Sequence, residues 1–297
     1  MKLLKYLFVL TMALFLMMPM MMYAVQKRAL LIGLSNYSKE YSWSKINGTN
    51  DIDLIKRGLK GFKITELRNA QATHDAIINA INALIHQTKG GDIVYLHFSG
   101  HGQPVEDIDG DEGDGWDESF VPYDAGQIYG YKGYKGDKHL LDDQLNLYIQ
   151  RLRQKAGNRG FVYIVIDACH SGTMDRGDET DSSDFDVAPI RGTNQGFSAS
   201  KFYRPKKDLK PISHYNLQSD KSLADIIILE ACGPNQKNQE IKVDGKFYGP
   251  LSYSVFQMLN TQGLIGSKKW YESVRKNMNR LLQKSLSNQQ MVVETSL

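Results

Sequence analysis

The sequence predicts an α/β fold in which a mostly parallel central sheet is covered by helices on both faces. Two observations support this class. Short apolar runs rich in β-branched residues are typical of buried strands, and stretches with apolar residues at helical spacing separate many of them. Parallel neighbours need such crossover connections, whereas antiparallel neighbours need only a short turn. The alternation therefore favours a largely parallel sheet.

The N-terminal half of the chain supplies three predicted strands and two predicted helices. The apolar runs at 28–33, 63–67 and 92–98 are the strands. The first helix begins in the capping segment Gly48–Asp51, and the second is capped by Thr73. Each predicted helix follows one strand and precedes the next, as crossovers between parallel strands require.

The C-terminal half continues this pattern after an acidic loop. The predicted elements are a short strand at 119–122, a helix from Asp142 or Asp143 to Gly157, strands at 161–166 and 224–232, helices around 253–259 and 270–282, and an edge strand at 291–293. Residues 174–222 lack a periodic apolar pattern and are predicted to form a functional or mobile linker. Its basic residues are predicted to be exposed, namely Arg176, Arg191, Lys201, Arg204, Lys206, Lys207 and Lys210.

The N-terminus resembles an export signal. Lys2 and Lys5 precede an uncharged, apolar run from Tyr6 to Ala24. We therefore expect residues 1–24 to be a signal peptide cleaved near Ala24, and the protein to be periplasmic or secreted. An uncleaved membrane anchor is the alternative, because a run of 19 residues is close to the length that spans a bilayer.

Charge and cysteine content narrow the classes of function. Lys and Arg (36) nearly balance Asp and Glu (33), so the sequence gives no reason to expect a nucleic-acid partner. Cys169 and Cys232 are too few for a disulfide framework. Cys232 ends a predicted strand without a second histidine motif, and we expect it to be a structural thiol.

Two predicted strands end in clusters that carry reactive side chains. One strand leads into Ser99-Gly100-His101-Gly102, and the other leads into Asp167-Ala168-Cys169-His170-Ser171-Gly172. An imidazole beside a thiol is the arrangement that nucleophilic catalysis by cysteine needs. The N–H groups of Gly102 and Cys169 are the predicted oxyanion donors. Taken together, these motifs favour a catalytic role over a buried structural thiol and a turn histidine.

These motifs resemble those of caspase-fold cysteine peptidases, the group that includes caspases and metacaspases, and the bacterial metacaspase-like branch fits best. The resemblance also rests on Leu30-Leu31-Ile32-Gly33, Asp114-Gly115-Trp116-Asp117-Glu118 and Leu141-Asp142-Asp143. It implies a caspase-like three-layer sandwich over residues 25–297. Within it, 27–173 would be a large-subunit-like part, 174–222 a flexible linker and 223–297 a small-subunit-like part.

The resemblance also implies roles for individual residues. His101 and Cys169 would be the catalytic pair. Asp51, Ser99 and Asp167 would form an acidic pocket for an Arg or Lys side chain, since a cation entering a partly buried pocket needs a carboxylate partner. Asp51 as an ordinary helix cap, Asp167 as a strand-end carboxylate that orders its loop, and Ser99 as a turn residue are the alternatives.

A calcium site is a further implication of the resemblance. Its carboxylates would be Asp117, Asp142, Asp143 and Asp175, which would order the loops that frame the active site. The alternative is a solvated acidic surface in which Asp142 or Asp143 caps a helix. No redox or organic cofactor is expected, so calcium would be an activator only.

The predicted function is therefore that of a cysteine endopeptidase cleaving after Arg or Lys, with protein or peptide substrates. Self-cleavage within the linker is expected from its basic residues. A catalytically inactive caspase-fold scaffold or binding module, and a transpeptidase using the same thiol, are the alternatives. We expect a monomer, with membrane contact only if the N-terminal segment stays uncleaved.

Overall fold

The structure is a computed structural model that describes residues 24–110, 115–169, 188–193, 195–200, 203, 215, 217, 220–233, 236–283 and 288–297. The predicted leader apart from Ala24, and Asp175 of the predicted calcium site, lie outside these residues. Within the described part of the chain, none of the helices is both long enough and apolar enough to span a bilayer.

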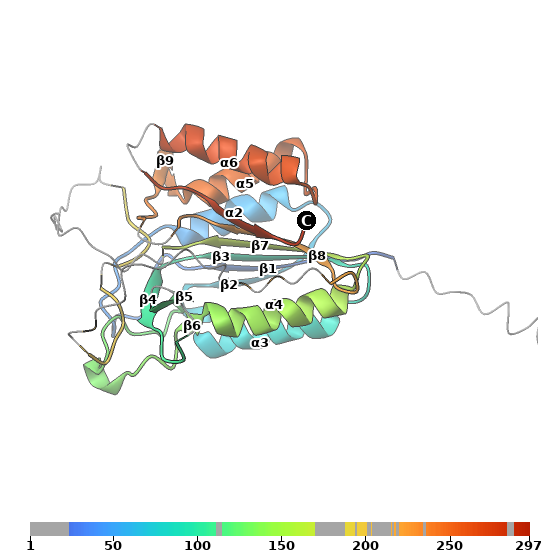
Figure 1. Cartoon of the computed structure of the whole chain (residues 1–297). Coiled ribbons are helices and arrows are strands. Elements are labelled where there is room, and N and C mark those ends of the chain that lie inside the picture. The colour runs from blue at the N-terminus through green and yellow to red at the C-terminus, as the bar shows by residue number, and fades with distance from the viewer. Residues whose placement is uncertain are drawn as a thin grey trace, which may run out of the picture.

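A six-stranded sheet forms the centre of the molecule, in the order β11-β8-β7-β3-β1-β2 (Figure 1). Its strands are β1 (Lys27–Gly33), β2 (Lys63–Arg68), β3 (Ile93–Ser99), β7 (Phe161–Asp167), β8 (Asp225–Glu230) and β11 (Val292–Thr295). Neighbours pair in parallel except at the edge, where β11 runs antiparallel to β8. The predicted mostly parallel sheet is confirmed, including the edge strand near the C-terminus.

Helices cover both faces of this sheet (Figure 1). On one side lie α2 (Gly48–Gly58), α5 (Pro250–Thr261) and α6 (Lys268–Leu282), and on the other side lie α3 (His74–Gln87) and α4 (Asp142–Ala156). Alternate residues of β1 enter opposite apolar layers: Leu30 and Ile32 belong to one layer, and Ala29 and Leu31 to the other. Burial on both faces explains why the central strands are continuous apolar runs.

Local signals fix the ends of several helices. The Thr73 side chain accepts a hydrogen bond from the N–H of Ala76 at the start of α3, as its N-cap position predicts. Gly157 follows the last turn of α4 with a φ of 60°, a conformation that glycine adopts without steric cost. Short 3₁₀ turns occur at Asn69–Gln71 and Tyr131–Gly133.

Two small antiparallel sheets lie beside the carboxyl ends of the parallel strands. One contains β4 (Gly102–Glu106), β5 (Trp116–Phe120) and β6 (Leu140–Leu141), and the other contains β9 (Ile241–Val243) and β10 (Lys246–Tyr248). The sequence did not predict β4, because glycine and proline are unusual in strand interiors. The strand expected at 119–122 instead begins at Trp116 and ends before Pro122, which has no N–H for a ladder.

Candidate active site

The site lies where β3 and β7 end side by side. Ser99 and Asp167 are direct partners in the parallel ladder between these strands. One step further on, the N–H of Gly100 donates to the carbonyl of Asp167 at 3.3 Å. The sheet register therefore carries the two predicted motifs to one edge, where open α/β sheets place their ligands.

Cys169 is 2% exposed, forms no disulfide and lies two residues beyond β7. Its Sγ donates to the main-chain carbonyl of Gln236 at 3.1 Å. Cys232 is also buried, and no disulfide joins the two cysteines. Cys169 therefore carries a thiol, as the predicted nucleophile must.

His101 is fully buried, and its ring stacks on Trp43 with the ring centroids 4.9 Å apart. Its Nε2 lies 2.9 Å from the main-chain carbonyl of Ser44, and a carbonyl can only accept. This contact assigns the proton to Nε2 and leaves the lone pair on Nδ1, which has no hydrogen-bond partner among the described residues. Burial lowers the pKa of His101 to about 4, so the imidazole is neutral at pH 7 and can act as a base.

One carbonyl oxygen joins the two predicted catalytic motifs. The N–H groups of Gly102 and Cys169 both donate to the main-chain oxygen of Arg191, at 3.3 Å and 2.9 Å. These are the two predicted oxyanion donors, and a peptide carbonyl is the group that an oxyanion hole receives. The structure therefore brings both donors together around a carbonyl of the chain itself.

The side chain of Arg191 enters a pocket of carboxylates. Its Nη1 contacts Asp51 at 2.7 Å, the Ser99 hydroxyl at 2.7 Å and Asp167 at 3.4 Å. On the other side of the guanidinium, Glu240 Oε1 accepts from Nε at 3.1 Å and from Nη2 at 2.9 Å. The predicted exposure of Arg191 is wrong, since the residue is 0% exposed, because these carboxylates and the serine surround its charge.

Asp51 and Asp167 differ in how they are used. The Asp51 carboxylate accepts from Ser99 Oγ at 2.6 Å and from the N–H of Gly249 at 3.0 Å, contacts that do not cap α2. Asp167 Oδ2 accepts from both the N–H and the hydroxyl of Ser252, in the first turn of α5. Asp167 therefore orders the start of α5 as well as facing Arg191.

Burial and the neighbouring charges shift the pKa values of the groups in this pocket. Burial raises the pKa of Asp51 to about 7, and although Arg191 opposes this shift, Asp167 adds to it. Burial by itself would lower the pKa of Arg191, but the carboxylates of Asp51, Asp167 and Glu240 outweigh it and raise that pKa above its usual value. A cationic occupant therefore stays charged here.

Three of the four predicted calcium ligands lie in or next to the small sheet that contains β4, β5 and β6. Asp117 is on β5, and Asp142 and Asp143 begin α4. Burial raises the pKa of Asp143, and the neighbouring carboxylates of Asp109 and Asp107 add to the effect. Among the described residues, no three His, Cys, Asp or Glu side chains lie close enough to hold a metal ion. Three of the four predicted ligands therefore do not fit a metal site by themselves.

Sequence reasoning missed two contributors to the site. Glu240 lies just before β9 and is 1% exposed, and Asn47 fixes its carboxylate through a main-chain N–H and a side-chain amide at 2.7 Å and 2.6 Å. Ser44 orients His101 through a backbone carbonyl, which any residue type would supply. Neither position carries a motif, so only the fold reveals it.

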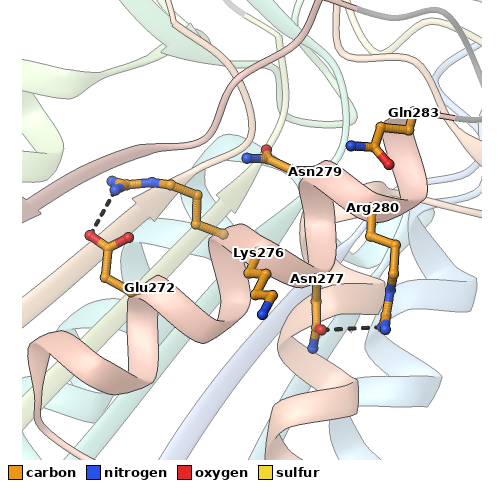
Figure 2. Close-up of a pocket in the computed structure, with 7 residues that line it drawn as sticks. Glu272, Lys276, Asn277, Asn279, Arg280 and Gln283 are labelled. Atoms are coloured by element: carbon orange, nitrogen blue, oxygen red, sulfur yellow. Dashed lines mark hydrogen bonds and ion pairs between the residues drawn. The ribbon is translucent and has the colours of Figure 1, made fainter.

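A surface hollow of about 440 Å³ lies elsewhere, along α6 (Figure 2). Arg275 pairs with Glu272 at 2.7 Å, and Arg280 donates to the Asn277 side chain at 3.2 Å. All lining residues lie on α6 or directly after it, whereas the two predicted catalytic motifs follow β3 and β7. This hollow is therefore separate from the candidate active site.

Comparison with known proteins is consistent with this geometry. The family model described as "Caspase domain" matches residues 26–296. The chain belongs to this family. The caspase domain is also similar to metacaspase-1 of Pyricularia oryzae, with 30% identity over 161 residues, and to metacaspase-1 of Mycosarcoma maydis, with 22% identity over 284 residues. The match to the former covers 50% of this chain and 37% of that protein, and the match to the latter covers 84% and 66%.

Solved structures agree on the fold of this caspase domain. Protein GSU0716 from Geobacter sulfurreducens superposes with a TM-score of 0.56 at 24% identity, covering 91% of this chain and 93% of that one. A structure described as pro-sf-caspase-1 superposes with a TM-score of 0.51 at 15% identity, covering 94% and 90%. The caspase-like three-layer fold expected from the sequence is therefore confirmed.

Proposed function

We propose that this caspase domain is a cysteine endopeptidase that cleaves after Arg or Lys, with Cys169 as nucleophile and His101 as proton carrier. The observation that carries the proposal concerns Arg191. Its main-chain carbonyl accepts from the N–H groups of Gly102 and Cys169, and its guanidinium is buried among carboxylates. Membership of the caspase domain family supports a cysteine peptidase.

The residues of the site divide the work of acyl transfer. His101 Nδ1 takes the proton of the Cys169 thiol, and the sulfur attacks the carbonyl carbon that follows the basic side chain. The developing oxyanion accepts hydrogen bonds from the N–H groups of Gly102 and Cys169. His101 returns the proton to the leaving amine as the peptide C–N bond breaks, and water then hydrolyses the thioester to a carboxylate and a free thiol.

The ring of His101 is held for this task on several sides. The Ser44 carbonyl fixes its tautomer, and the stacked Trp43 fixes the plane of the ring. The main-chain N–H of His101 donates to the Tyr37 hydroxyl at 2.6 Å. These contacts leave Nδ1 as the ring atom free to exchange a proton.

A set of otherwise identical peptides ending in Arg, Lys, Gln or Asp before a fluorogenic group tests the proposal. We expect cleavage of the Arg and Lys peptides by the wild type and none by Cys169→Ala. An Arg-directed thiol-reactive probe should label Cys169 in the wild type. Failure of both cleavage and labelling would support an inert scaffold, and peptide transfer to an added amine in place of hydrolysis would support a transpeptidase.

Calcium activation is a separate proposal, motivated by the carboxylates of Asp117, Asp142 and Asp143 beside the active site. We expect chelator to lower the thermal midpoint of unfolding as well as peptide cleavage, and added calcium to restore both. The same measurements on Asp143→Asn should show a reduced response to calcium. If chelator changes neither the thermal midpoint of unfolding nor the rate of peptide cleavage, calcium does not activate this protein.

A further inference from the structure

We propose that the bond between Arg191 and Gly192 is a substrate of this same site, held for cleavage within its own chain. This inference rests on the proposed function and adds which bond is cut and what fills the pocket beforehand. It follows from the way in which residues 189–193 and 195–197 lie across the active site. Each part of this segment makes contacts that a bound peptide would make.

The residues before the bond pair with the chain as an added strand. The N–H of Glu240 donates to the carbonyl of Pro189 at 2.9 Å, and the N–H of Arg191 donates to the carbonyl of Asn238 at 2.9 Å. Ile190 and Gln239 form an antiparallel bridge between these two contacts. Strand addition of this kind is a common way to bind an extended peptide.

The residues after the bond run beside β4. Gly192 forms a parallel bridge with Gly102, and Val105 forms one with Phe197. Phe197 is 3% exposed and packs against the rings of Tyr134 and His139. The segment is therefore anchored on both sides of the Arg191–Gly192 bond.

Gly192 lies directly against the nucleophile. A Cβ built on this residue would come within 2.8 Å of Cys169 Cβ, 2.9 Å of its carbonyl oxygen and 3.2 Å of its Sγ. Only glycine fits this position without a displacement of the segment or of Cys169. The thiol thus faces the bond that follows Arg191.

A purely structural ion pair would not require this arrangement. Buried ion pairs are weak sources of stability, because desolvation of the charges offsets much of their attraction. A structural role for the Arg191 side chain also gives no reason for its main-chain oxygen to accept from both oxyanion donors. Occupation of the acidic pocket and of the oxyanion hole by one residue is what a substrate requires.

Cleavage would consume one water molecule. The sulfur of Cys169 bonds to the carbonyl carbon of Arg191, the C–N bond to Gly192 breaks, and the Gly192 amine leaves with a proton from His101. Water then releases the Arg191 carboxylate and restores the thiol. Because β7 precedes the cut and β8 follows it within one sheet, the two pieces should stay together in the native state.

This arrangement should also inhibit cleavage of external peptides by the uncut chain. Arg191 fills the pocket that an external basic side chain needs, so an external peptide must compete with a tethered occupant. We expect the uncut protein to cleave Arg peptides slowly, with a rise in rate as the Arg191–Gly192 bond is cut. The rate of cutting should not depend on protein concentration, since the substrate is part of the same chain.

Denaturing mass spectrometry of the purified full chain tests this proposal. We expect two fragments, one ending at Arg191 and one beginning at Gly192, in the wild type and none in Cys169→Ala. Arg191→Gln should slow this cut by at least about a hundredfold, since glutamine brings no charge to the carboxylates. Lys221→Gln is the matched control, because it also removes a basic residue of the predicted linker, and its Arg191–Gly192 bond should be cut at the normal rate.

Gly192→Ala supplies a second variant that leaves the acidic pocket intact. The added methyl should displace the segment, slowing the internal cut while an Arg peptide is cleaved at least as fast as by the uncut wild type. In the wild type, an Arg191–Gly192 bond that stays intact while Arg peptides are cleaved at a constant rate, or that is cut only by added active enzyme, would overturn this inference and leave the proposed function standing. Absence of both activities would overturn both.

Discussion

Replacement of Asp51 by asparagine is expected to lower kcat/KM for an Arg peptide by about a hundredfold to a thousandfold. The Asp51 carboxylate contacts the guanidinium of Arg191 at 2.7 Å, and both side chains are 0% exposed. Loss of one partner from a buried ion pair costs about 3–5 kcal/mol, and the carboxylates of Asp167 and Glu240 that remain at the guanidinium keep the expected loss near the lower end of that range. Asparagine keeps the shape and the oxygen that accepts from Gly249, so the fold should survive the change.

The matched control for this variant is Asp53→Asn, on the same helix. Asp53 is exposed and pairs with Arg68 at 2.7 Å, and surface pairs of this kind contribute little. Peptide kinetics and thermal unfolding of both variants separate binding from stability. Equal kcat/KM for Asp51→Asn and wild type would show that Asp51 does not contribute to the proposed preference for a basic residue.

The pH profile should change with the same substitution. With an arginine in the pocket, burial raises the pKa of Asp51 to about 7, so protonation below that pH removes a negative charge that the substrate needs. The pKa of His101, lowered by burial to about 4, leaves its base form populated well below pH 7. We therefore expect kcat for an Arg peptide to fall as pH drops through about 7 in the wild type. Asp51→Asn should lack that fall in kcat below pH 7, with Asp167, Ser99 and Glu240 still facing the guanidinium of the substrate.

Much of the fold followed from the sequence because buried strands are hard to mistake. The run Phe161–Ile166 is apolar throughout since β7 lies at the centre of the sheet with both faces covered. The small strands were harder to recognise. Gly102–Glu106 contains glycine and proline, and it forms a strand because β5 and the segment near Phe197 pair with it.

The site shows where sequence reasoning stops. Asp51, Ser99 and Asp167 could be named in advance because each adjoins a motif or ends a strand, and the structure gathers them around one guanidinium. For Arg191 in the linker, by contrast, the prediction from the sequence was wrong. Composition marked Arg191 as exposed, but composition cannot show that a polar segment pairs with Asn238 and Glu240 across the cleft. Pairing between segments so far apart depends on tertiary structure, which local patterns do not encode.

Glu240→Gln is expected to weaken the preference for arginine over lysine. Glu240 Oε1 accepts from two nitrogens of the Arg191 guanidinium, while Asp51 binds the third nitrogen on the opposite side. A planar guanidinium can span both carboxylates at once, whereas the single ammonium group of lysine cannot. The native site should therefore favour arginine peptides.

Removal of the Glu240 charge should lower kcat/KM for an Arg peptide by about tenfold to a hundredfold, as expected for a charged hydrogen bond worth about 1.5–3 kcal/mol. The Lys peptide should lose less, so the ratio of the two rates should fall. Asp244→Asn is the matched control, because this exposed carboxylate lies four residues further along the same segment. A parallel loss for both peptides in Glu240→Gln would mean that Glu240 supports the pocket without selecting between the two cations.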